Sequence, residues 1–265
     1  MLRFSVECGM AKMNYYIETY NLSKEFTNSR KLPYFLLSPS KKPKTAPTVN
    51  NINLQIKNGE LFGILGPNGA GKTTLIKMLC CLILPTGGTA KVVGYDILKD
   101  EEKVKASIGL ISGDERSFYW RLTGLQNLQF FATLYNLTPD QARTKIKELL
   151  EFFEIEEPDK RFQEYSAGIK QKLAIAKSLL NSPKVLFMDE PTKSLDPEAA
   201  QRLRVFIKDK IAKQQNITVF FATHNLEEAE HLADRLAVID KGNIRACGRM
   251  EDIRGEIRKC FYERQ

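Results

Sequence analysis

The sequence predicts an α/β core that is interrupted by a helical insert. Three observations predict this class. Short apolar runs of strand length alternate with segments of helical periodicity along most of the 265 residues. A glycine-rich stretch joins one such run to a helical pattern, and a long helical region separates two later runs. The length fits one domain, or one domain with a subdomain, and no internal repeat divides it.

The strands are predicted from apolar runs and from their boundaries. Alternation over residues 52–56 predicts a first strand, and the apolar run 61–65 is typical of a buried one. The helical pattern that follows the glycine-rich stretch continues to about residue 82, before Pro85. Further strands are expected at 89–93, 108–112, 185–188, 217–222 and 236–239.

Three helices are predicted from their caps and periodicity. Residues 138–141 (TPDQ) resemble a capping box with proline at the first helical position, which opens a helix to about Phe153. Ser166 can cap a helix that runs to about Leu180. Near the end, Ile253 and Ile257 recur among charged residues, which predicts a short amphipathic helix at about 249–262.

Composition excludes several classes of protein. Hydrophobic residues make up 43% and charged residues 27%, which excludes a disordered, collagen-like or disulfide-stapled chain. No window has the length of apolar sequence that a membrane span needs, and the first residues lack the apolar stretch of a signal peptide. The five cysteines have no metal-ligand spacing, so free thiols in a reducing compartment are expected. We therefore expect a cytoplasmic protein.

The positive charge is concentrated in one segment. Lys and Arg number 40 against 32 Asp and Glu, a net charge of +8, and six basic residues with one acid lie between residues 24 and 44. Prolines and serines in the same stretch predict a surface insertion at about 27–47. This insertion is either a solvated loop or a segment that contacts anionic lipid headgroups or a partner. The rest of the chain is nearly balanced in charge, so no nucleic-acid partner is expected.

The glycine-rich segment 66–73 (GPNGAGKT) fits the phosphate-binding pattern G-x-x-x-x-G-K-[ST]. A strand precedes it and a helix follows it, as the pattern requires. Its glycines allow backbone N–H groups to point at phosphate oxygens, and the helix N-terminus adds its positive dipole end. Lys72 is expected to reach the β- and γ-phosphates, and the Thr73 hydroxyl to ligate Mg²⁺.

A second chemical signal is the apolar strand 185–188, which is followed by Asp189 and Glu190. Two acids at a buried strand end are costly unless they have a function. Beside a phosphate loop, Asp189 can hold the metal, directly or through water. Glu190 is then placed to polarise an attacking water as a general base.

Further segments complete a recognisable set. Residues 165–171 (YSAGIKQ) resemble the signature motif of ABC transporters. Residues 194–196 (SLD) resemble the D-loop of that family, and His224 resembles its switch histidine. Phe26 matches the aromatic residue on which adenine stacks. The chain thus resembles the nucleotide-binding domain of ABC transporters, over about residues 17–248, in the form found in polysaccharide and drug exporters.

The resemblance implies a fold, ligands and site residues. The fold is a P-loop NTPase core with a RecA-like parallel sheet, a small antiparallel β part and an inserted helical subdomain at about 112–178, all within a single nucleotide-binding domain, 1–265. The ligands are ATP and Mg²⁺, with Glu190 and His224 catalytic, and with Thr73 and Asp189 at the metal. The residues implied in nucleotide binding are Phe26, Gly66, Pro67, Asn68, Gly69, Ala70, Gly71, Lys72, Thr73, Thr74, Ser166 and Gly168.

Each carried-over residue also has a purely structural interpretation. Ser166 can be only a helix cap, His224 a hydrogen-bonded structural histidine, and Phe26 a core residue. The chain also departs from the family pattern. Gly113 stands where the family has a glutamine that touches Mg²⁺, and Ile169 replaces the last glutamine of the signature. Water or Asp114 could fill the metal position that the missing glutamine leaves.

The resemblance implies an ATP-binding and ATP-hydrolysing subunit that powers a membrane transporter, with export favoured. It would work as a head-to-tail dimer, with a homodimer favoured, on a separate transmembrane permease at the inner face of the cell membrane. Two alternatives stay open at this point. One is an ABC-superfamily ATPase that serves translation or DNA repair, and the other is a kinase or another P-loop transferase.

Overall fold

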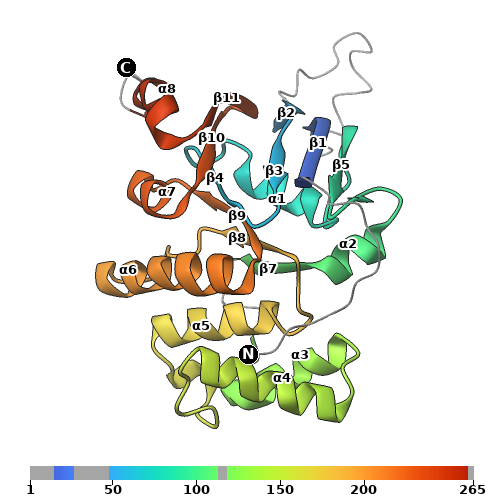
Figure 1. Cartoon of the computed structure of the whole chain (residues 1–265), viewed down its shortest axis with the longest axis vertical. Coiled ribbons are helices and arrows are strands. Elements are labelled where there is room, and N and C mark those ends of the chain that lie inside the picture. The colour runs from blue at the N-terminus through green and yellow to red at the C-terminus, as the bar shows by residue number, and fades with distance from the viewer. Residues whose placement is uncertain (1–14, 27–47, 113–117, 262–265) are drawn as a thin grey trace, which may run out of the picture.

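The computed structural model describes residues 15–26, 48–112 and 118–261. Two β-sheets occupy the upper and middle parts of the view in Figure 1, and a group of helices closes the opposite end. None of the helices in these described ranges has the length and apolar character that a bilayer span requires. The expected insertion at 27–47 and the segment with Gly113 and Asp114 lie outside the described residues.

The first sheet is antiparallel. Its strands run in the order β2-β1-β5-β6, and β3 pairs with β1. The bounds are β1 Tyr15–Lys24, β2 Val49–Ile52, β3 Gln55–Lys57, β5 Gly87–Val92 and β6 Tyr95–Asp96. Alternate residues of β1, such as Ile17 and Thr19, are buried, as in a sheet with one face covered.

The second sheet carries the site. Its order is β11-β10-β4-β9-β8-β7, and the pairs from β10 to β7 are parallel, whereas β11 is antiparallel to β10. The bounds are β4 Leu61–Leu65, β7 Ile108–Ser112, β8 Val185–Asp189, β9 Thr218–Thr223, β10 Arg235–Asp240 and β11 Asn243–Gly248. Every residue of β4 and β9 is buried, as expected for central parallel strands covered on both faces. Their carboxyl ends meet at one edge.

Eight α-helices flank the sheets in the described part of the chain. They are α1 Lys72–Leu79, α2 Glu101–Ser107, α3 Gly124–Leu134, α4 Pro139–Phe152, α5 Ala167–Ser178, α6 Pro197–Phe206, α7 Leu226–Leu232 and α8 Met250–Phe261. A 3₁₀ turn spans Phe162–Glu164, and a π-helical segment, Ile207–Gln214, continues α6. Capping boxes open α3 and α4, in which Thr123 pairs with Gln126 and Thr138 with Gln141.

The parallel sheet separates two cores. Phe187 and Phe220 belong to the core shared with the antiparallel sheet and α1. Their neighbours Met188 and Phe221 point to the other face, where the core includes residues of α5 and α6. In Figure 1, α3 and α4 lie beyond α5 at the end of the molecule away from the sheets.

The predicted fold class is confirmed: a parallel sheet, an antiparallel β part and helices between strands β7 and β8 are all present. Several bounds differ from expectation by one or two residues, such as those of β5, which spans Gly87–Val92 instead of 89–93. Two boundaries differ more. The predicted strand at 52–56 is split between β2 and β3. Helix α1 ends at Leu79 instead of residue 82, because Cys81 takes a left-handed conformation with φ 55°.

Candidate nucleotide-binding site

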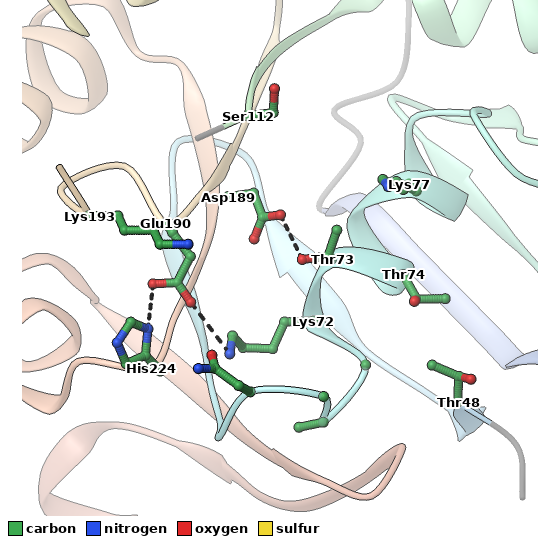
Figure 2. A pocket seen from close by; sticks show the side chains of 14 residues that line it. Thr48, Lys72, Thr73, Thr74, Lys77, Ser112, Asp189, Glu190, Lys193 and His224 are labelled. Atoms are coloured by element: carbon green, nitrogen blue, oxygen red, sulfur yellow. Dashed lines mark hydrogen bonds and ion pairs between the residues drawn. The ribbon is translucent and has the colours of Figure 1, made fainter. Parts of the chain in front are cut away.

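Three loops at the carboxyl edge of the parallel sheet form the site. The glycine-rich loop follows β4, Glu190 follows β8, and His224 follows β9. Figure 2 shows their side chains turned toward one cavity of about 870 Å³. The site therefore lies where open parallel sheets commonly bind ligands.

The glycine-rich loop leaves its backbone available for anions. Gly71 precedes α1 with φ 108°, and no side chain caps the helix. A Cβ atom at Gly71 would lie 2.3 Å from the carbonyl oxygen of Thr48, so a side chain is excluded there. In the described part of the chain, the first N–H groups of α1 thus have no side-chain acceptor, which is the arrangement that binds phosphate.

Lys72 is almost completely buried, with 6% of its surface exposed. Its Nζ donates to the carbonyl oxygens of Gly66 at 2.7 Å and Pro67 at 3.2 Å. It also lies 3.5 Å from Oε1 of Glu190. The ammonium group is therefore fixed at the bottom of the cavity instead of extending into solvent.

Thr73 and Asp189 provide oxygen ligands for a cation. The Thr73 hydroxyl donates to Oδ2 of Asp189 at 2.7 Å. The second carboxylate oxygen, Oδ1, is buried and has no hydrogen-bond partner among the described residues. A buried, unpaired carboxylate oxygen next to a hydroxyl suits a hard cation such as Mg²⁺, so these two residues fit the metal that the sequence predicts.

Glu190 is held between two groups. Its Oε2 lies 2.7 Å from Nδ1 of His224, and its Oε1 faces Lys72. Its backbone has φ 54°, an uncommon conformation for a residue other than glycine, and its N–H donates to the carbonyl oxygen of Ala222. The strained backbone and the two partners aim this carboxylate into the cavity (Figure 2).

Most of the predicted residues come together. Asn68, Gly69, Ala70, Gly71, Lys72, Thr73, Thr74, Asp189, Glu190 and His224 line the cavity. Gly66 and Pro67 contribute through their carbonyl oxygens to Lys72. Four lining residues were not predicted: Thr48, Lys77, Ser112 and Lys193. Of these, Lys77 follows Thr73 by four residues on α1, so helical spacing could have placed it on the same face.

Three predicted residues lie elsewhere. Ser166 and Gly168 line a separate hollow, of about 590 Å³, together with Asp196. Ser166 caps α5 by accepting a hydrogen bond from the N–H of Ile169. Phe26 is 49% exposed with the Lys24 amine 5.2 Å from its ring centroid, and it does not line the cavity. Gly113, where the family has glutamine, is not among the described residues.

Comparison with known proteins agrees with this geometry. The ABC transporter family model matches residues 49–193. The chain is 36% identical over 213 residues to the ABC transporter ATP-binding protein NatA of Bacillus subtilis, covering 80% of this chain and 86% of NatA. The chain belongs to the ABC transporter family.

Other relatives of this ABC ATP-binding subunit extend the comparison. It is 37% identical over 209 residues to the daunorubicin resistance ATP-binding protein DrrA3 of Streptomyces coeruleorubidus, covering 78% of this chain but only 65% of DrrA3. The structure of cbiO1 from Clostridium perfringens superimposes with a TM-score of 0.78 at 26% identity, over 95% of this chain and 97% of cbiO1. The subunit is thus an ATP-binding cassette that hydrolyses ATP to power a transporter.

Proposed function

We propose that this cassette binds ATP together with Mg²⁺ in the cavity at the carboxyl edge of the parallel sheet, and that Glu190 is the general base for hydrolysis. The observation that carries the proposal is the placement of the Glu190 carboxylate between Lys72 and His224. The backbone N–H groups at the start of α1 and the Lys72 ammonium hold the phosphates. Mg²⁺, when bound by Thr73 and Asp189, supplies positive charge that offsets the phosphates.

In the reaction, Glu190 accepts a proton from a water molecule while the water oxygen attacks the γ-phosphorus. The bond from that phosphorus to the β-phosphate oxygen breaks, so ADP and inorganic phosphate leave. His224, 2.7 Å from Glu190, orients the carboxylate and can share its proton. The protein contributes position and charge, which is the main requirement of phosphoryl transfer.

We also propose that two copies of the chain combine head to tail. Ser166 and Gly168 lie in a hollow separate from the cavity with Lys72, so one chain does not bring both halves of the site together. The N-terminus of α5, a 12-residue helix capped by Ser166, suits an anion such as the γ-phosphate of nucleotide held by the other copy. A second copy placed head to tail therefore completes each site.

The transporter partner is proposed from the relatives. DrrA3 is a daunorubicin resistance protein, and cbiO1 is part of the ABC transporter complex cbiONQ. By analogy, this cassette drives export through a separate permease subunit at the cytoplasmic face of the membrane. Contact of segment 27–47 with that permease or with anionic headgroups stays a prediction, to be tested by deleting the segment and measuring transport and vesicle binding.

Replacing Glu190 by glutamine tests the central proposal. Glu190→Gln keeps the shape but removes the base, so hydrolysis should fall about 100-fold or more while ATP binding persists. ATP-bound dimer should then accumulate in size-exclusion chromatography. The exposed Glu230, changed to glutamine, is the matched control and should hydrolyse normally. Hydrolysis by Glu190→Gln at the parent rate would contradict the assignment.

A further inference from the structure

A buried acid lies behind the catalytic loops and takes no direct part in the proposed reaction. Glu228, on α7, is only 1% exposed and does not line the nucleotide cavity. Burying a carboxyl group is costly unless its oxygens are hydrogen-bonded. The contacts of the Glu228 carboxyl group therefore indicate which function offsets the cost of its burial.

The Glu228 carboxyl group joins two loops. The Thr192 hydroxyl donates to its Oε1 at 2.8 Å, and the Thr223 hydroxyl lies near enough to the carboxyl group to lower its pKa. Thr192 follows Glu190 by two residues, and Thr223 directly precedes His224. One side chain thus bridges the segments that carry the two members of the Glu190–His224 pair.

Further bonds make this connection rigid. The N–H of Asn225 donates to the Thr223 hydroxyl oxygen at 2.9 Å, and Asn225 Oδ1 accepts from the N–H of Glu228 at 3.3 Å. Thr223 is therefore bonded to Asn225, and Asn225 to α7, so the residues on both sides of His224 are held together. Hydrogen-bonded networks of this kind hold functional groups in one geometry.

Charged groups on neighbouring elements also face Glu228. Burial is the main cause that raises the pKa of its carboxyl group; Glu190 adds to the rise, while the two threonine hydroxyls and Arg204 oppose it. Arg204, on α6, is itself buried and pairs with Glu227 at 2.9 Å. The hydrogen bonds depend on an acceptor oxygen at position 228, which a glutamine amide also provides.

We propose that Glu228 is a positioning residue that sets the contact between Glu190 and His224 by bridging the loops on which they lie. Catalysis of phosphoryl transfer depends on placement, and a displacement of about 1 Å can cost about 100-fold in rate. This inference rests on the proposed roles of Glu190 and His224.

The test separates positioning from nucleotide binding. Glu228→Ala should lower kcat for ATP at least tenfold, with KM within twofold of the parent, because the phosphate contacts are untouched. Glu228→Gln keeps an acceptor for Thr192 and should retain at least half of the parent kcat. Glu230→Ala, exposed on the same helix, is the control and should leave both constants unchanged.

Two further variants keep the inference falsifiable. Thr192→Val removes one bond of the bridge with little change in shape, so kcat should fall several-fold even if Glu228→Ala does not fold. In a Glu190→Gln background, Glu228→Ala should cause no additional loss of residual single-turnover hydrolysis, because a positioning residue acts through Glu190.

Three results would overturn the inference: an unchanged kcat in Glu228→Ala or Thr192→Val, a loss expressed in KM alone, or an additive loss in the double variant. These results can be distinguished from a failure of the proposal that Glu190 is the base. In that case Glu190→Gln itself would hydrolyse ATP normally, whatever the behaviour of Glu228→Ala.

Discussion

We expect Lys177, a half-buried lysine on α5, to reduce the stability of the fold at neutral pH. Burial lowers the pKa of Lys177 from 10.5 to about 8. At 1.36 kcal/mol per pH unit, this corresponds to about 3 kcal/mol by which the folded state disfavours the charged amine. Its Nζ lies 4.9 Å and 4.8 Å from the ring centroids of Phe118 and Phe131, and at a partly exposed site such cation–π contacts are worth about 0.5–1 kcal/mol each.

Replacing Lys177 by methionine should therefore stabilise the protein. The change removes the desolvation cost but also the ring contacts, which leaves a net gain of about 1–2 kcal/mol at pH 7. At about 2–4 °C per kcal/mol for a domain of this size, Tm should rise by several degrees. Urea unfolding at a series of pH values measures the gain directly.

The gain should depend on pH with a defined sign. Below pH 8 the amine is charged in both states, so the cost is fully present. Between pH 8 and 10.5 the folded state loses its proton first, so the parent gains stability relative to the variant, and the difference shrinks. Lys147→Met, at a side chain that is 77% exposed, is the control and should show no such trend. A Lys177→Met protein that is less stable than the parent at every pH would refute the reasoning.

Three other experiments test the nucleotide site. Gly71→Ala should weaken ATP binding at least tenfold in equilibrium titration, because its Cβ would lie 2.3 Å from the Thr48 oxygen and φ is 108°; parent-like binding would show that the loop can adjust. Asp189→Asn should raise the Mg²⁺ concentration for half-maximal hydrolysis about tenfold or more, since a charged ligand is lost; an unchanged requirement would place the metal elsewhere. Mixing Ser166→Arg with Lys72→Ala protein should recover part of the ATPase rate that each lacks alone, and no recovery would count against shared sites.

The parts of the fold that could be predicted are those with local signals. Strand β4 was predicted with its observed bounds, because five apolar residues lie directly before the glycine-rich loop. Strand β1 was not predicted. Its alternation is interrupted where Asn21 takes φ 50° and the register with β5 shifts between Tyr20 and Ser23. Strand β1 is stabilised by pairing with strands that are distant in the sequence, and its own pattern does not reveal this pairing.

The site residues can be divided in the same way, into those with a local sequence signal and those without one. The loop 66–73 is a continuous motif whose strand and helix context the sequence also shows, so its residues could be assigned in advance. Lys193 and Thr48 reach the cavity only through the folded arrangement of loops. Glu228 bonds Thr192, 36 residues away, and lies near Thr223, and no spacing pattern predicts these neighbours. Phe26 shows the opposite limit, since a match to a family position did not bring its ring to the cavity.

The neighbourhood of Lys72 has a consequence for how nucleotide enters. Lys72 is 6% exposed, and its ammonium group has Glu190 as a negative partner at 3.5 Å. The desolvation of the Lys72 ammonium group is thus a cost of folding and is not a further cost of ATP binding. If Lys72 holds phosphate as proposed, we expect phosphate and the Glu190 carboxylate to compete for the same cation.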